Sequence, residues 1–258
     1  NGAKDGEQKA IFYGCVGFLQ RLTSLRKSLM LWELSLGQMW ELADSYDLSV
    51  PTVVNEEHLL SLAAGVWDAS MKDTSVLDFD DQLAFPIYHN LRVEQYDFVL
   101  VDEAQDLSPV QIELTKRACA HRAIYCGDRH QAIYQFRGAD RAAVPNIIEA
   151  MSCSLLPLSI CYRCASSIVD RARVIVPQIE AGPEAQAGIV DFSSLSEYEP
   201  QSGDFVLSRT TAPAVQECLK FIRKGQKAVV KGRDIGQSIL ALVKQVRGVT
   251  QEMALAAF

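Results

Sequence analysis

The sequence lacks any apolar run long enough to cross a membrane, and it lacks an excess of basic residues. No uninterrupted apolar stretch reaches the roughly 18 residues that a membrane-spanning helix needs, so we expect no membrane partner. The 258 residues include 25 lysines and arginines against 32 aspartates and glutamates, which gives a net charge of −7. This balance excludes a protein that coats nucleic acid by bulk charge, although a few local residues can still contact DNA.

The cysteines do not form the paired pattern of a disulfide framework or of a zinc site. There are seven, an odd number, scattered mostly through apolar stretches. This usage is typical of reduced thiols inside a cell. Cys161 and Cys164 make a single C-x-x-C, whereas a zinc site needs a second pair at similar spacing. We therefore expect ordinary core cysteines and no metal cluster.

The first part of the chain has the pattern of a helical protein. Large apolar residues recur near helical spacing through residues 1–75, so this segment is predicted to be helical. Asn55 followed by Glu56 and Glu57 predicts the start of one of these helices, with Asn55 as its N-cap.

After residue 96, short apolar runs alternate with helical patterns. Strands are expected at residues 98–101, 123–126, 155–160, 189–190, 205–207 and 228–230. One helix is expected to begin at residue 109, and three others are expected at 165–179, 213–224 and 234–246. This alternation favours an α/β architecture with largely parallel sheets.

The strongest functional signal is the hexapeptide VDEAQD at residues 101–106, directly after an apolar run. Carboxylates at the carboxyl end of a buried parallel strand lie where open α/β folds bind ligands. Mg²⁺ keeps most of its waters and needs only one or two carboxylates, so Asp102 is the candidate ligand. Glu103 would orient and deprotonate an attacking water, and Gln105 and Asp106 would link the site to neighbouring elements. The alternative is an acidic helix start favoured by the helix dipole.

A second polar segment, GDRHQAIYQFRGAD at residues 127–140, follows the next expected strand. Gln131 is a neutral amide that can hydrogen-bond a phosphate oxygen or an attacking water. Tyr134 and Phe136 lie beside Arg137, and such a group suits stacking on unpaired bases, worth about 1–3 kcal/mol per base. Each aromatic residue taken alone also fits a position in a core.

These two segments resemble motifs II and III of superfamily 1 DNA helicases in the UvrD/Rep/PcrA branch. Weaker matches occur in the family's order: DFDDQL at 78–83 lies upstream of these two segments, and the Tyr-Arg within LPLSICYRC at 156–164, VLSRTTA at 206–212 and VKGRDI at 230–235 lie downstream of them. The resemblance covers roughly residues 75–246, and the later segments look most like phage-encoded members.

The resemblance implies an ATP-dependent DNA helicase, a hydrolase that uses ATP and Mg²⁺ in processes such as DNA replication or DNA repair. By the same resemblance, Asp102 is the Mg²⁺ ligand and Glu103 is the catalytic base. Gln131 is implied to sense the γ-phosphate and the attacking water. The implied partners are single-stranded DNA and junctions between single-stranded and duplex DNA.

Five further residues receive roles from the resemblance. Tyr134, Phe136 and Arg137 are implied to couple the ATP state to single-stranded DNA. Tyr162 is implied to stack on the adenine, and Arg163 to reach the γ-phosphate as an arginine finger. Such an arginine neutralises charge that develops on the transferred phosphoryl group. A structural ion pair is the alternative for Arg163.

The implied fold class is α/β, with two partial RecA-like P-loop NTPase domains and an N-terminal helical segment. The helical segment, similar to domain 1B of the family, is expected at residues 1–75. The first RecA-like part, with motifs II and III, is expected at 76–151, and the second, with motif IV, at 152–258. ATP is then expected in a cleft between the two RecA-like parts.

The phosphate-cradling loop G-x-x-x-x-G-K-[ST] does not occur in the sequence, and neither do the family's motifs V and VI. We therefore expect an internal piece of a longer helicase that is inactive alone, from the cytoplasm of a bacterial cell or of a phage-infected host. Three alternatives stay open: the UvrD-like ATPase module of a helicase–nuclease, a non-catalytic helicase-like interaction module, and a non-nucleotide enzyme with an acidic metal site.

Overall fold

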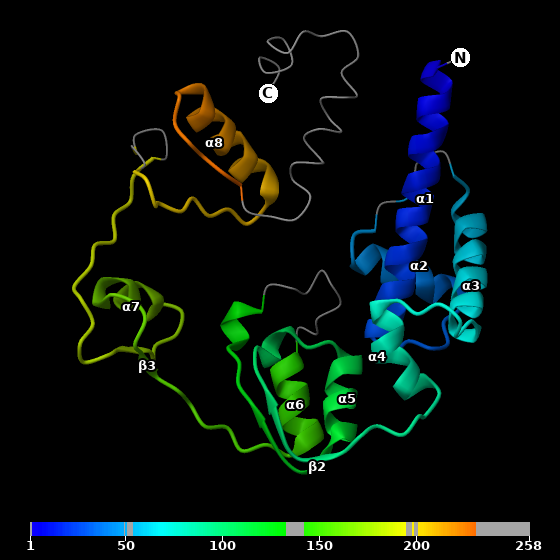
Figure 1. Ribbon diagram of the computed structural model, residues 1–258, viewed down its shortest axis with the longest axis horizontal. Coiled ribbons are helices and arrows are strands. Elements are labelled where there is room, and N and C mark those ends of the chain that lie inside the picture. Colours follow the sequence, from blue (N-terminus) through cyan, green and yellow to red (C-terminus); the bar gives the residue numbers. More distant parts are fainter. Residues whose placement is uncertain are drawn as a thin grey trace. The chain divides into compact units, whose positions relative to one another are not determined.

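The computed structural model describes residues 2–48, 50, 54–132, 142–194, 198 and 201–230. The chain divides into two compact units, Asn1–Leu158 and Ser159–Phe258. The elements of the first unit are α1 (Gly2–Ser28), α2 (Leu36–Ser45), α3 (Glu56–Lys72), α4 (Phe79–Tyr88), β1 (Tyr96–Val101), η1 (Ala104–Asp106), α5 (Pro109–Ala118), β2 (Cys119–Tyr125), η2 (Arg129–Gln131) and α6 (Ala143–Met151). Those of the second unit are β3 (Ile160–Cys161), α7 (Ser166–Ala172), β4 (Glu180–Ala181) and α8 (Thr211–Arg223). The chain is thus mixed α/β, as predicted (Figure 1).

Helices α1, α2 and α3 form a helical part of the first unit, which confirms the helical prediction for this stretch. Their apolar faces meet in a core built from Phe18, Leu22, Leu25, Met39, Leu42, Leu59 and Leu60. The predicted N-cap is also confirmed, because Asn55 Oδ1 accepts the N–H of His58 at 2.9 Å. No helix within the described residues combines the length and apolar character needed to cross a bilayer.

The DFDDQL segment forms the start of α4 and ties it to α1. Asp78 Oδ1 accepts the N–H of Asp81 at 2.7 Å, and Asp81 Oδ2 accepts the N–H of Asp78 at 3.0 Å, which is a capping box. Lys27 comes from α1 and its side chain is only 2% exposed. Its Nζ lies 2.6 Å from Asp81 Oδ1 and 3.5 Å from Asp78 Oδ2. A buried cation therefore holds the acidic start of α4 in place.

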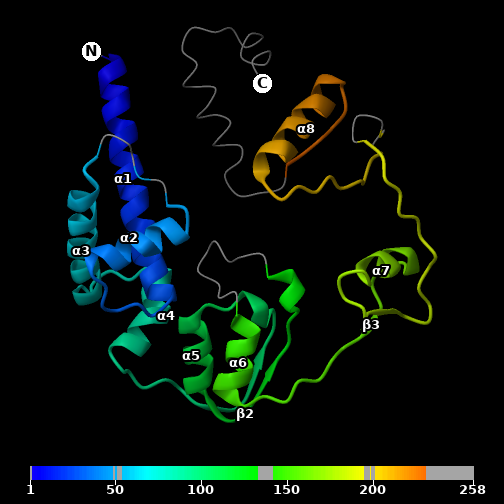
Figure 2. The ribbon, with the colours of Figure 1, turned by 180° about the vertical axis from the view of Figure 1, so that it is seen from behind.

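Strands β1 and β2 form a parallel pair, as predicted for this region. Their register places Phe98 opposite Arg122 and Val101 opposite Tyr125. The intervening helix α5 and the later helix α6 contact each other and lie against these strands (Figures 1 and 2). The core beneath the helices contains Ala104, Ile112, Ala143 and Ile147, with Val101 and Tyr125 packed against it.

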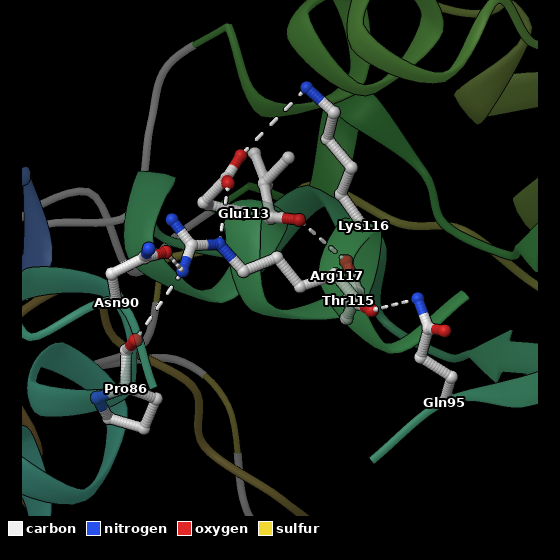
Figure 3. Close-up of polar contacts among 8 residues, drawn as sticks. Pro86, Asn90, Gln95, Glu113, Thr115, Lys116 and Arg117 are labelled. Atoms are coloured by element: carbon white, nitrogen blue, oxygen red, sulfur yellow. Dashed lines mark hydrogen bonds and ion pairs between the residues drawn. The ribbon is translucent and has the colours of Figure 1, made fainter. Parts of the chain in front are cut away.

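Arg117, near the end of α5, fixes the connection that leads into β1 (Figure 3). Its Nε donates to Glu113 Oε1 at 2.9 Å, and its Nη1 donates to Asn90 Oδ1 at 3.2 Å and to the Pro86 carbonyl at 3.4 Å. The Arg117 carbonyl also accepts from Gln95 Nε2 at 3.5 Å. One side chain thereby joins α5 to the end of α4, which steadies the position from which β1 starts.

Among its described residues, the second unit contains one short parallel ladder, in which Ile160 pairs with Glu180 and Cys161 with Ala181. The predicted helix at 213–224 is confirmed as α8, while the one expected at 234–246 lies outside the described residues. Of the strand expected at 155–160, only Ile160 is in a strand, which also includes Cys161. The segments 189–190, 205–207 and 228–230, which were also expected to be strands, are not strands.

Two physical reasons explain these corrections. Leu155, Leu156 and Leu158 are 73–93% exposed, and within the described residues no strand pairs with them, so their apolar character alone does not produce a ladder. The helix expected at 165–179 ends at Ala172. Pro177 excludes a continuous helix to 179, because it lacks an N–H and disfavours helical geometry in the residue before it.

Candidate functional site

The two polar segments that were predicted to carry the chemistry begin at the same edge of the β1–β2 pair. Asp102 directly follows β1, and the glycine at 127 comes soon after β2. The backbone joins the two exits, because the N–H of Ala104 donates to the Cys126 carbonyl at 2.9 Å and the N–H of Cys126 donates to the Val101 carbonyl at 2.8 Å. The carboxyl ends of parallel strands are the edge where α/β folds bind ligands.

Asp102 and Glu103 place two exposed carboxylates at this edge. Asp102 Oδ1 accepts the N–H of Glu103 at 2.9 Å. Glu103 has φ +51° and ψ 41°, the left-handed region that side-chain-bearing residues rarely adopt. Such a conformation costs on the order of 1–3 kcal/mol and persists only where neighbouring contacts hold it. Neighbouring contacts therefore hold the Glu103 backbone in a conformation that is unfavourable for this residue.

Gln105 supplies the contact that holds Glu103. Gln105 is buried, with only 2% of its surface exposed. Its Oε1 accepts the N–H of Asp128 at 3.0 Å, and its Nε2 donates to Glu103 Oε2 at 2.7 Å. The N–H of Asp128 can only donate, so the amide oxygen must face it and the amide nitrogen must face the carboxylate. The predicted linking role of Gln105 is confirmed by this geometry.

Asp128 continues the chain of hydrogen bonds to Gln131. Its Oδ2 accepts from Gln131 Nε2 at 2.8 Å, and its Oδ1 accepts the N–H of His130 at 2.9 Å. The N–H of Gln131 also donates to the Asp128 carbonyl at 2.9 Å. A continuous series of contacts, Glu103–Gln105–Asp128–Gln131, therefore connects the residue after β1 to the residue predicted as the phosphate sensor.

Gly127 makes the close approach of the two segments possible. A Cβ at this position would lie 2.6 Å from Gln105 Oε1, 3.0 Å from the Ala104 nitrogen and 3.1 Å from the Gln105 nitrogen. Two of these three atoms are backbone, so they cannot move aside as a flexible side chain would. Any side chain at 127 would push η1 away from the end of β2.

Sequence reasoning found Asp102, Glu103 and Gln131 but missed Asp128 and Gly127 as parts of this arrangement. The available signal was the Gly-Asp pair that comes soon after β2, in the same way that the acids follow β1. Asp106 was expected to link elements, but its Oδ1 is buried without a hydrogen-bond partner in the described part of the chain.

The remaining predicted site residues belong to other parts of the chain. Tyr134, Phe136 and Arg137 lie outside the described residues. Tyr162 and Arg163 belong to the second unit, where they follow β3 and are exposed, Tyr162 by 78%. Their roles stay predictions.

The donor set at the edge suits a hydrated divalent cation. Mg²⁺ keeps several waters and is held by one or two carboxylates together with substrate phosphates, and Asp102 and Glu103 supply such carboxylates. Within the described residues, no group of three or more histidine, cysteine, aspartate or glutamate side chains is arranged to hold a metal ion.

Comparison with known proteins shows which family the region around these two strands resembles. Residues 50–151 match the UvrD/REP helicase N-terminal domain, and this match includes both polar segments. The resemblance predicted from motifs II and III is therefore confirmed at the level of the family: residues 50–151 match the N-terminal domain of UvrD/REP helicases, and the relatives include Rep helicases.

Individual relatives agree with this assignment. The chain is 32% identical to the ATP-dependent DNA helicase Rep of Salmonella typhimurium over 123 residues, covering 43% of the chain and 18% of that protein. It is 28% identical to Rep of Escherichia coli over 147 residues, covering 50% of the chain and 22% of that protein. It is 33% identical to the RecBCD enzyme subunit RecB of Mycolicibacterium smegmatis over 91 residues, covering 34% of the chain and 8% of that protein. The chain thus spans at most about a fifth of the length of these relatives.

Proposed function

We propose that this chain supplies the magnesium- and water-binding part of the ATP site in a helicase that couples ATP hydrolysis to movement along single-stranded DNA. The family match and the names of the Rep relatives, which are ATP-dependent DNA helicases, support this proposal. The observation that carries it is the hydrogen-bonded series Glu103–Gln105–Asp128–Gln131 at the carboxyl ends of two parallel strands.

In this proposal, Asp102 holds Mg²⁺, which when bound neutralises charge on the β- and γ-phosphates. Glu103 orients the attacking water and accepts its proton. Gln131 contacts the γ-phosphate or that water. Because Gln105 and Asp128 connect Gln131 to Glu103, a displacement of the sensor changes the position of the base. Hydrolysis then depends on the conformation of the segment that follows Gln131.

The second unit and the segment after residue 132 receive their roles from the family resemblance. The proposed adenine contact is Tyr162 and the proposed arginine finger is Arg163. The proposed contacts to single-stranded DNA are Tyr134, Phe136 and Arg137. The same resemblance leads us to propose two partial RecA-like domains, with boundaries at 75/76 and 151/152.

The alternatives differ in how well they fit the site. A non-catalytic interaction module has no need of two exposed acids at this edge, yet Asp102 and Glu103 are both exposed and Glu103 has a left-handed backbone. The helicase–nuclease alternative differs in whether a nuclease is joined to this unit. The proposed roles of Asp102, Glu103 and Gln131 are the same in both cases.

The test is the DNA-stimulated ATPase rate of the complete protein that contains this chain. Glu103→Gln keeps an oxygen for the Gln105 amide but removes the base. We expect kcat to fall by about 100-fold or more, since general base catalysis contributes 10²–10⁴-fold, while ATP still binds. Glu149→Gln, an exposed glutamate on α6, is the matched control and should leave kcat unchanged. A Glu103→Gln variant that hydrolyses ATP at the unmodified rate rules the proposal out.

A further inference from the structure

Gly182, the residue directly after β4, lies against the end of β3, from which Tyr162 follows. The two strands pair in parallel, with Cys161 opposite Ala181. The N–H of Gly182 donates to the Cys161 carbonyl at 2.9 Å, and the Gly182 carbonyl accepts the N–H of Ala185 at 3.0 Å. The backbone of Gly182 is therefore held on both sides, next to the residue that precedes Tyr162.

Tyr162 occupies the space in which a side chain at position 182 would stand. A Cβ added to Gly182 would lie 3.1 Å from Tyr162 Cδ1, 3.3 Å from the Cys161 carbonyl oxygen and 3.5 Å from Tyr162 Cα. The first distance is shorter than the roughly 3.5–4.0 Å at which two carbon atoms make their best contact. Gly182 does not have a left-handed backbone, so the lack of space, and not its φ, accounts for a glycine here.

The Tyr162 ring combines a fixed support with a large open surface. Gly182 is buried, whereas Tyr162 is 78% exposed, so the ring is supported near Cδ1 and most of its surface is accessible to solvent. A ring that rests against a held backbone has fewer orientations available than a ring surrounded by solvent. An aromatic side chain that is already oriented can stack on a base without the entropic cost of being ordered on binding.

We propose that Gly182 is a positioning residue for the nucleotide: because it has no side chain, the Tyr162 ring rests against its backbone with the exposed ring surface free for the adenine base. This role rests on the proposed adenine contact of Tyr162, and Gly182 acts only through that ring. An alanine at 182 displaces the ring, which the nucleotide must then order on binding. Ordering one such side chain lowers affinity by roughly 2- to 12-fold.

The first test is the steady-state ATPase of the complete protein that contains this chain, at saturating single-stranded DNA. We expect Gly182→Ala to raise the KM for ATP by roughly 2- to 12-fold and to leave kcat nearly unchanged. Tyr162→Ala should raise the KM by roughly 5- to 150-fold, the range that stacking of one base on an aromatic side chain contributes. Gly65→Ala is the matched control: it adds the same methyl group where nothing lies near the Cβ position, and both constants should stay unchanged.

The double variant Tyr162→Ala/Gly182→Ala separates positioning from a purely structural role. Its KM should equal that of Tyr162→Ala, because no ring remains for the new methyl group to displace. An effect of Gly182→Ala that persists without the ring, or a lower kcat in place of a raised KM, overturns the positioning role. Tyr162→Ala with an unchanged KM refutes the adenine contact itself, whereas an unchanged KM in Gly182→Ala beside a raised KM in Tyr162→Ala refutes the role of Gly182 alone.

A second measurement, on the chain itself, does not depend on ATP turnover. With fluorotyrosine incorporated in place of tyrosine, Tyr162→Phe identifies the fluorine NMR resonance of Tyr162 by its loss. We expect Gly182→Ala to shift this resonance, because the surroundings of the ring change, and Gly65→Ala to leave it in place. A Tyr162 resonance at the same chemical shift in Gly182→Ala and in the unmodified chain means that the ring does not rest on Gly182, and it overturns the proposal.

Discussion

Replacing Gly127 with alanine tests whether the two strand ends depend on close contact. The new Cβ would meet Gln105 Oε1 at 2.6 Å and the backbone nitrogens of Ala104 and Gln105 at 3.0 and 3.1 Å. Overpacking of this kind costs about 1–3 kcal/mol. Moving the Gln105 amide also weakens its bonds to Asp128 and Glu103, at about 1 kcal/mol each. We expect Gly127→Ala to lower the free energy of unfolding by about 2–4 kcal/mol.

The assay is urea unfolding followed by far-UV circular dichroism, with Gly65→Ala as the matched control. Gly65 lies inside α3 with nothing near its Cβ position, so alanine there should stabilise by about 0.5–1 kcal/mol. The two substitutions add the same methyl group and should act with opposite sign. Gln105→Ala should absorb part of the Gly127→Ala cost, so that the double variant is more stable than additivity predicts. Gly127→Ala unfolding at the unmodified midpoint would refute the contact.

Two further predictions concern the ion pairs at the start of α4. Lys27→Met removes a buried cation from Asp81 and should lower the free energy of unfolding by about 3–5 kcal/mol, whereas Lys116→Met, at a half-exposed pair, should change the urea midpoint little. Burial raises the pKa of Asp78, but the hydrogen bond from the Asp81 N–H and the charge of Lys27 outweigh it, so the pKa lies below its ordinary 3.8. The stability from Asp78 is therefore present above that value and is lost as the pH falls through the lowered pKa. Acid titration of the urea midpoint should show this loss, and Asp78→Asn should reduce it.

The part of the site that was predictable from sequence depended on local patterns. Asp102 and Glu103 follow an apolar strand, and Gln131 comes soon after the next one, so the parallel arrangement alone brings them to one edge. The end of α7 was predicted wrongly, because the helix expected at 165–179 ends at Ala172, although Pro177 already argued in the sequence against a helix that continues to 179.

The remaining strands and the Asp128 junction were not predictable in the same way. An apolar run such as 155–158 becomes a strand only if another segment pairs with it, which is a property of the whole fold. Asp128 is a junction because its N–H, its carbonyl and both its carboxylate oxygens find partners in space, three on its own turn and one on η1. No spacing rule states that the residue 23 positions before it will be buried against it.

The geometry nevertheless explains why the fifth residue of VDEAQD is glutamine. The position faces a carboxylate on one side and a backbone N–H on the other, so its side chain must donate in one direction and accept in the other. A glutamate there would place a second negative charge against Glu103, and a leucine would leave the part-buried N–H of Asp128 without its acceptor. An asparagine has the right groups but is one methylene shorter. Glutamine has both the length and the two-sided hydrogen bonding that join the proposed base to the proposed sensor.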